Sequence, residues 1–276
     1  MPTKLFINGE SVPLSFWTFP GGERNVRIDF ANKHSPSAGV LIECTYKGSD
    51  DLVDLIMLVN ALRQENLSNI SLSIPYFPFA RQDRVMTSGE ANALQAIAQV
   101  FNMLNLKHIE ISDPHSDVLE ALFPPGVLSI NRQWEIWGAH ISAYEDLTNI
   151  GLVSPDTGAL KKIYNLAGVL NVPVVCAQKV RDVSTGKITS TTIDVSNVLN
   201  LTSLYVVDDI CDGGRTFIEL AKAIRSQGYA GKLVLCVTHG IFSQGLEVLG
   251  HYDTLRCYNN LSGLNIQQFN NRNNNV

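Results

Sequence analysis

At residues 204–216 the chain reads LYVVDDICDGGRT. A short apolar run rich in Val ends at two adjacent carboxylates and a Gly-Gly pair, and a helical apolar period follows and stops at Gly228. The pattern predicts a strand, an acidic glycine-rich loop and a helix. In an open parallel sheet such a loop lies where ligands bind, and its amides can hold an anion. Carboxylates beside an anion site suit a sugar phosphate, whereas the alternative is a strand ending in a solvated Asp-Asp turn.

This stretch resembles the phosphoribosyl-diphosphate loop of type I phosphoribosyltransferases and of ribose-phosphate diphosphokinases, which are also called PRPP synthetases. The resemblance implies that Asp208 and Asp209 hold ribose hydroxyls. It also implies a set of loop residues that bind the ribose phosphate, namely Asp212, Gly213, Gly214, Arg215 and Thr216. The choice between the two families depends on the rest of the chain.

The composition excludes several classes of protein. The 276 residues are 45% hydrophobic, and we expect them to form two domains of ordinary size. A formal net charge of −5 without a basic block argues against nucleic-acid binding. Five scattered cysteines without a C-x-x-C pair fit buried thiols in a reducing compartment. No apolar run is long enough to span a membrane and the first residues do not resemble a signal peptide, so we expect a cytoplasmic protein.

Residues 75–84 read PYFPFARQDR. Two prolines exclude a regular helix, and aromatic rings followed by arginines suit a nucleotide, because rings stack on a base and guanidinium groups bind phosphate oxygens. Surface arginines beside core aromatics are the alternative. PRPP synthetases carry a similar Ala-Arg-Gln-Asp run at this place, and phosphoribosyltransferases lack it. By that match Arg81, Gln82 and Asp83 contact ATP.

Three further motifs have a structural interpretation and a functional one. The FPGGE run at residues 19–23 predicts a hairpin, but a similar element of PRPP synthetases reaches the adenine of ATP across a subunit contact, which implicates Phe19 and Glu23. The SDPHS run at residues 112–116 is typical of a surface turn, but it resembles the family element whose histidine, here His115, binds Mg-ATP, with Asp113 beside it. Asp156 in SPDTG is typical of a helix cap, and the family places this carboxylate near the ribose and the metal.

A Lys-x-Arg pair, Lys179 and Arg181, precedes the sequence DVSTG, which predicts a mobile hairpin. Alternating basic residues in a hairpin are usually solvated. PRPP synthetases, however, carry such a pair on a loop that closes over the reacting phosphates, where fixed cations stabilise the developing charge. By this resemblance Lys179 and Arg181 are the predicted catalytic residues.

The matches run in family order along most of the chain, which resembles a short, divergent PRPP synthetase. The resemblance implies an α/β fold of two type I phosphoribosyltransferase-like domains, each a mainly parallel sheet flanked by helices. We expect residues 1–135 to bind ATP, residues 136–269 to bind the ribose phosphate, and residues 270–276 to be disordered. The implied reaction transfers the β,γ-diphosphate of ATP to the 1-hydroxyl of ribose 5-phosphate and releases AMP. Mg²⁺ would be held at His115 and Asp156, and the site would be partly shared between subunits of a homo-oligomer.

The phosphate loop departs from the family pattern. PRPP synthetases usually have Asp-Thr-x-Gly-Thr, whereas this chain has DGGRT at residues 212–216. Arg215 would bind either the same 5′-phosphate or a larger anionic substituent, as in ADP-ribose. A phosphoribosyltransferase, which shares the acidic loop, and a non-catalytic regulatory member of the family remain alternatives. The sequence determines neither the acceptor, nor the oligomer number, nor any allosteric control.

Overall fold

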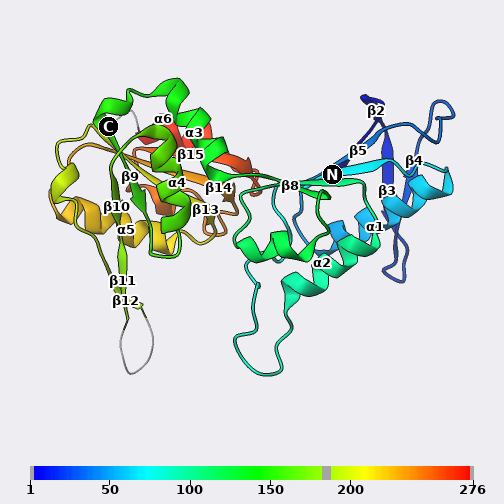
Figure 1. Ribbon diagram of the computed structural model, residues 1–276, viewed down its shortest axis with the longest axis horizontal. Coiled ribbons are helices and arrows are strands. Elements are labelled where there is room, and N and C mark those ends of the chain that lie inside the picture. The colour runs from blue at the N-terminus through cyan, green and yellow to red at the C-terminus, as the bar shows by residue number, and fades with distance from the viewer. Residues whose placement is uncertain (1–2, 182–187, 274–276) are drawn as a thin grey trace. The chain divides into compact units, whose positions relative to one another are not determined.

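The computed structural model describes residues 3–181 and 188–273 and divides the chain into two compact units, Met1–Asn131 (unit 1) and Arg132–Val276 (unit 2) (Figure 1). Each unit has its own sheet and hydrophobic core. Within the described part of the chain, no helix combines the length and the hydrophobicity needed to cross a bilayer.

Unit 1 is built on a six-stranded sheet. Its strand order is β2 (Glu10–Val12), β1 (Thr3–Ile7), β5 (Val40–Cys44), β6 (Ile70–Ser73), β7 (His108–Ser112) and β8 (Leu128–Asn131). The first two strands run antiparallel, and the last four run parallel. The connections contain α1 (Ser49–Gln64), α2 (Ala93–Met103) and the 3₁₀ turn η1 (Asp117–Leu122), and a separate hairpin consists of β3 (Leu14–Thr18) and β4 (Arg24–Ile28).

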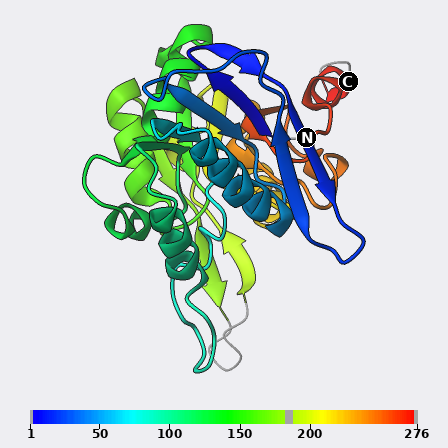
Figure 2. The same cartoon turned by 90° about the vertical axis from the view of Figure 1, so that its right-hand side faces the viewer.

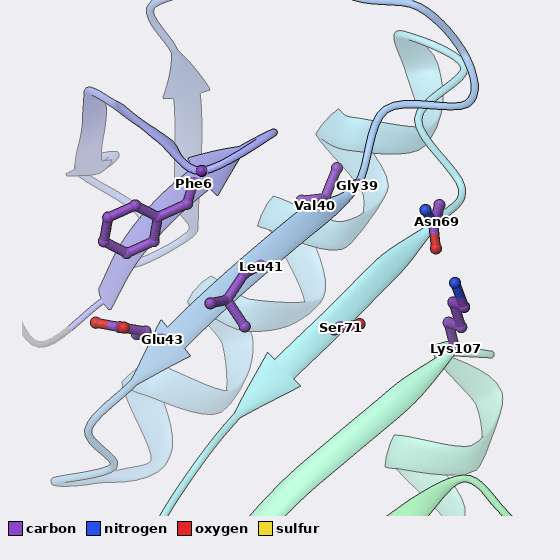
Figure 3. Close-up of a pocket in the computed structure, with 9 residues that line it drawn as sticks. Phe6, Gly39, Val40, Leu41, Glu43, Asn69, Ser71 and Lys107 are labelled. Carbon is purple, nitrogen blue, oxygen red and sulfur yellow. The ribbon is translucent and has the colours of Figure 1, made fainter.

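The helices of unit 1 lie on one face of this sheet. Because β5 to β8 are neighbours in sequence order, right-handed crossovers all pass over the same side. Ile42 and Leu72 point to that side and are fully buried, whereas Leu41 and Ser71 alternate to the other side. Figure 3 shows this second face, with α1 behind the strands and with Phe6, Leu41 and Ser71 in front, on three successive strands.

Unit 2 is built on a five-stranded, fully parallel sheet. Its strand order is β10 (Val174–Cys176), β9 (Ile150–Ser154), β13 (Ser203–Cys211), β14 (Lys232–Gly240) and β15 (Thr254–Asn260). The helices are α3 (Gln133–Tyr144), α4 (Leu160–Leu170), α5 (Arg215–Ser226) and α6 (Ile266–Asn273), and the 3₁₀ turns are η2 (Leu147–Asn149), η3 (Ser196–Val198) and η4 (Glu247–Leu249). A two-stranded ribbon of β11 (Gln178–Arg181) and β12 (Ile188–Thr192) extends away from this sheet in Figures 1 and 2.

The order in which the chain adds strands to this second sheet reverses at its centre, between β9 and β13. From β9 the chain crosses through α4 to β10 on one side, and from β13 it crosses through α5 to β14 on the other side. Tyr205 and Val207 accordingly pack with α3 and α4, whereas Leu204 and Val206 pack with α5. Open α/β sheets bind ligands at the carboxyl ends of the strands beside such a reversal, which here are β9 and β13. The expected α/β fold with mainly parallel sheets flanked by helices is confirmed.

The predicted strand, loop and helix at residues 204–226 are also present. The apolar residues that predicted α5 form its buried face, namely Phe217, Leu220, Ala221 and Ile224. Gly228, which follows the helix, has φ +85°, a conformation that an L side chain adopts only at a cost.

The expectation of a disordered tail from residue 270 is wrong for residues 270–273, which belong to α6. The side-chain amide of Asn270 accepts a hydrogen bond from the backbone N–H of Leu255 at 2.8 Å and donates one to its carbonyl at 3.0 Å. Because an amide carries both a donor and an acceptor, Asn270 takes the place of a neighbouring strand at the edge of the sheet. Residues 274–276 lie outside the described residues.

Removing this amide tests its structural role. We expect Asn270→Ala to lower the free energy of unfolding of unit 2 by about 1–2 kcal/mol, because the N–H and the carbonyl of Leu255 both lose a partner. Gln267→Ala, on the exposed side of α6, is the matched control. Urea denaturation measures both variants, and equal unfolding of the two would contradict the role of Asn270.

Candidate active site

The glycine-rich loop after β13 turns sharply into α5. Gly214 is the residue before the helix and has φ +77°, and a Cβ at this position would come within 3.1 Å of the Leu249 side chain. Glycine therefore fits this turn both in conformation and in space. The residue before α5, Gly214, has no side chain that could cap the helix, and the backbone N–H groups at a helix start can bind an anion.

Two carboxylates of β13 lie beside this loop. Asp209 is 7% exposed, and its backbone N–H donates to Oδ1 of Asp208 at 2.9 Å. Burial, together with the negative charge of Asp209, raises the pKa of Asp208 well above its ordinary value. Lys162 of α4 places its Nζ 3.5 Å from Oδ2 of Asp209. The site thus holds two adjacent carboxylates and one cation within a mostly buried corner of unit 2.

Asp156 joins this group from the end of β9. Its Oδ1 accepts hydrogen bonds from the backbone N–H groups of Gly158 at 2.9 Å and Ala159 at 3.1 Å, so the carboxylate does cap the start of α4. Its charge also contributes to the raised pKa of Asp208, because β9 and β13 are neighbouring strands. The structural and the functional interpretations of Asp156 are therefore compatible, and the strand reversal brings the three carboxylates together.

Arg215 lies on the surface of α5. Its side chain is 82% exposed, and its Nε donates to Oε1 of Glu219 one turn further along, at 2.8 Å. The other carboxylate oxygen of Glu219 accepts a hydrogen bond from Thr191 of β12 at 3.5 Å. Two other predicted phosphate-binding side chains are half-buried: Asp212 in the loop and Thr216 in the first turn of α5.

In unit 1, Asp83 lies at the carboxyl ends of β6 and β7. Its two oxygens accept hydrogen bonds from Nε and Nη2 of Arg84 at 2.8 and 3.1 Å. The bond to Arg84, with smaller contributions from Ser116 and His115, lowers the pKa of Asp83 to about 2. The structure thus brings Asp83 and His115 together, and the carboxylate of Asp83 is engaged by its own loop.

The neighbouring predicted ATP residues differ in exposure. Arg81 and Gln82 are exposed. The backbone carbonyl of Gln82 accepts from the N–H of Leu94, which links the segment to the start of α2. Asp113 is 1% exposed with φ +37°, and its N–H donates to the carbonyl of Asn131 at 2.9 Å, so Asp113 fixes the turn before His115.

The FPGGE run forms the turn between β3 and β4. The N–H of Phe19 donates to the carbonyl of Glu23 at 2.8 Å, and the rings of Trp17 and Phe19 meet edge to face at 6.0 Å. Arg24 anchors this hairpin on α1 through a 2.7 Å hydrogen bond to the buried Asp54. Phe19 itself is 47% exposed.

Lys179 and Arg181 belong to β11, which pairs antiparallel with β12 at Lys179 with Thr191 and at Arg181 with Ile188. The expected tip of this hairpin, residues 182–187, lies outside the described residues.

Sequence reasoning missed two residues, Arg84 and Lys162. Arg84 directly follows the predicted ATP residues, but adjacency in sequence does not show a paired carboxylate. A signal for Lys162 was present, because residues 160–163 read LKKI and place two cations in the first turn of a helix, where the helix dipole disfavours positive charge.

The pairing of Asp83 predicts an acid-dependent loss of stability. Because its pKa is lowered on folding, Asp83 contributes stability above about pH 4 that is lost as the pH falls toward about 2. We expect Asp83→Asn to flatten the pH dependence of the unfolding midpoint between pH 4 and pH 2, relative to Glu65→Gln on the exposed end of α1. Parallel curves for the two variants would contradict this assignment.

Comparison with known proteins identifies relatives along most of the chain. The model of the N-terminal domain of ribose phosphate pyrophosphokinase matches residues 7–104. Ribose-phosphate pyrophosphokinase of Pyrococcus furiosus is 31% identical over 232 residues, which cover 82% of this chain and 77% of that protein. The protein of the same name from Thermococcus kodakarensis is 28% identical over 228 residues, again with 82% and 77% covered.

A solved structure shares the fold. Phosphoribosylpyrophosphate synthetase from Mycobacterium smegmatis matches 89% of this chain and 80% of its own with a TM-score of 0.74 at 20% identity. Three observations indicate the same family: the acidic loop at the strand reversal, the run at residues 79–84, and the 31% identity to the Pyrococcus protein. The chain belongs to the ribose-phosphate pyrophosphokinase family.

Proposed function

We propose that this protein is a transferase that moves the β,γ-diphosphate of ATP to the 1-hydroxyl of ribose 5-phosphate, with Mg²⁺ as cofactor. One observation carries the proposal: Asp156, Asp208 and Asp209 converge beside the glycine-rich loop that leads into α5. This arrangement offers acceptors for sugar hydroxyls next to N–H donors for a phosphate. A ribose phosphate presents both groups.

The roles of the ribose site follow from this geometry. Asp208 and Asp209 accept hydrogen bonds from ribose hydroxyls, and the amides of Gly213 and Gly214, with the hydroxyl of Thr216, bind the 5′-phosphate. A Cβ placed on Gly213 would lie 3.6 Å from the Gln244 side chain and 3.9 Å from the Ser243 hydroxyl, which are ordinary contact distances. Because glycine lacks that Cβ, a phosphate can approach the backbone of the loop closely.

The reaction needs little covalent chemistry from the protein. The O1 atom of the ribose attacks the β-phosphorus of ATP, the bond from that phosphorus to the α,β-bridging oxygen breaks, and AMP leaves while the hydroxyl proton is lost. Lys179 and Arg181 are proposed to stabilise the charge on the transferred phosphates and on the leaving oxygen. Holding both substrates in line for the attack further lowers the activation barrier.

The donor set of the site suits Mg²⁺. Carboxylate oxygens are the ligands of this cation, which usually binds through one or two carboxylates together with waters and substrate phosphates. Among the residues that the structure describes, no three His, Cys, Asp or Glu side chains form a group that could hold a metal. We propose that His115 and Asp156 would hold Mg²⁺ together with ATP, where the cation would neutralise phosphate oxygens.

The ATP site is proposed to lie on unit 1. Arg81, Gln82 and His115 bind the nucleotide, and Asp83 supports their segment through its bonds to Arg84. Phe19 and Glu23, at the exposed tip of the β3 and β4 hairpin, are proposed to reach the nucleotide of a neighbouring subunit. On this proposal the active protein is a homo-oligomer.

The same transfer to a 5′-substituted ribose such as ADP-ribose is the second candidate, and it rests on Arg215. The guanidinium of Arg215 is 82% exposed and pairs with Glu219 on the surface of α5, and this geometry is compatible with either acceptor.

Parallel assays of AMP release from Mg-ATP test the acceptor. We expect turnover with ribose 5-phosphate to exceed turnover with ADP-ribose, and we expect Arg215→Ala to change kcat/KM for ribose 5-phosphate by less than about tenfold, since an exposed ion pair contributes little. Turnover with ADP-ribose alone would contradict the proposed acceptor, and turnover with neither would favour a phosphoribosyltransferase or a non-catalytic member.

Replacing Lys179 tests the catalytic assignment. Lys179→Ala should lower kcat by roughly two to three orders of magnitude, because a cation that meets developing charge is lost, with little change in the midpoint of thermal unfolding. Lys222→Ala, which removes an exposed lysine of α5, is the matched control. A strongly lowered midpoint with nearly normal kcat would show that Lys179 has a structural role instead.

A further inference from the structure

Lys162 stands in an unfavourable place for its helix. It lies in the first turn of α4, where the dipole of the helix repels a cation, and Lys161 beside it carries the same charge. The Lys162 side chain is only 23% exposed, whereas Lys161 is exposed. Lys162 is therefore poorly solvated and lies at an unfavourable position of its helix. Its ion pair with Asp209 offsets these two costs.

The partner of Lys162 is one of the two ribose-site carboxylates. The Asp209 side chain is 9% exposed, and its Oδ2 lies 3.5 Å from the Nζ of Lys162. Asp209 follows the alternation of Tyr205 and Val207, which face α3 and α4, whereas Asp208 follows Leu204 and Val206 on the α5 side. Asp209 thus faces the side of the sheet from which Lys162 of α4 reaches it.

Without a cation, this corner of the site would concentrate negative charge. Asp156, Asp208 and Asp209 lie together, and a ribose phosphate brings more negative charge to the adjoining loop. A largely buried carboxylate keeps its charge and its orientation only when a partner compensates for the lost solvation. Lys162 supplies this compensation from α4, across the reversal between β9 and β13.

We propose that Lys162 is a positioning residue for the acceptor: it holds Asp209 charged and oriented so that the carboxylate accepts a hydrogen bond from a ribose hydroxyl. The inference rests on the proposed function and assigns a role to a residue outside the recognised motifs. Lys162 acts through Asp209 and contacts no reacting atom.

Steady-state kinetics with Mg-ATP and ribose 5-phosphate test this role. We expect Lys162→Met to raise KM for ribose 5-phosphate by about tenfold while kcat and KM for ATP change little, the size of a coupling between residues in contact. Lys162→Arg should restore most of the affinity, because it keeps the charge and the reach of the side chain. Lys161→Met, which removes the same charge from the same turn, is the matched control and should leave KM unchanged.

A double-mutant cycle separates positioning from direct contact. In an Asp209→Asn background, Lys162→Met should add no further increase in KM, because the group on which it acts has lost its charge. A full additional increase would show that Lys162 contacts the substrate itself and would overturn the proposed role. If Lys162→Met unfolds, Lys162→Gln in the same cycle gives the comparison.

Two outcomes distinguish a wrong function from a wrong role for Lys162. Wild-type protein that releases no AMP with ribose 5-phosphate would overturn the proposed function, and the role of Lys162 with it. Active wild-type protein with an unchanged KM in Lys162→Met would overturn the role of Lys162 alone.

Discussion

The site depends on one topological constraint, the reversal of the strand order between the neighbouring parallel strands β9 and β13. The right-handed crossovers through α4 and α5 leave these strands toward opposite sides, and open α/β sheets bind ligands at the carboxyl ends of such a strand pair. Asp156, which follows β9, therefore lies near Asp208 and Asp209, which belong to β13. In the sheet of unit 1, by contrast, β5 to β8 follow in order and their helices lie on one face.

Binding of the proposed substrates also depends on electrostatics. The chain carries a net charge of −5, yet its proposed substrates are anions, so the attraction must come from a few placed groups. In unit 2 these are the loop amides at the start of α5 and the cation of Lys162, which offsets the carboxylates around it. In unit 1, Arg84 has the corresponding effect on Asp83 and keeps its pKa low.

Local patterns predicted a large part of this structure. The strand, loop and helix at residues 204–226 follow from hydrophobic periodicity and glycine placement, and the buried residues of α5 are those with helical spacing. Contacts between distant segments could not be predicted in this way. Lys162 meets Asp209 only because β9 and β13 are neighbours, and Asn270 pairs with the edge of β15 although its surroundings in sequence are typical of a disordered tail. The family resemblance named the motif residues but not these supporting contacts.

The most direct test of the central claim is the affinity for ribose 5-phosphate in the absence of ATP, measured by isothermal titration calorimetry for the wild-type protein and for Asp208→Asn. If the acceptor binds at Asp208, beside the reversal, the wild type binds ribose 5-phosphate and the variant loses most of that affinity while its fold is retained. Equal affinity of the two proteins would place the acceptor elsewhere and contradict the account.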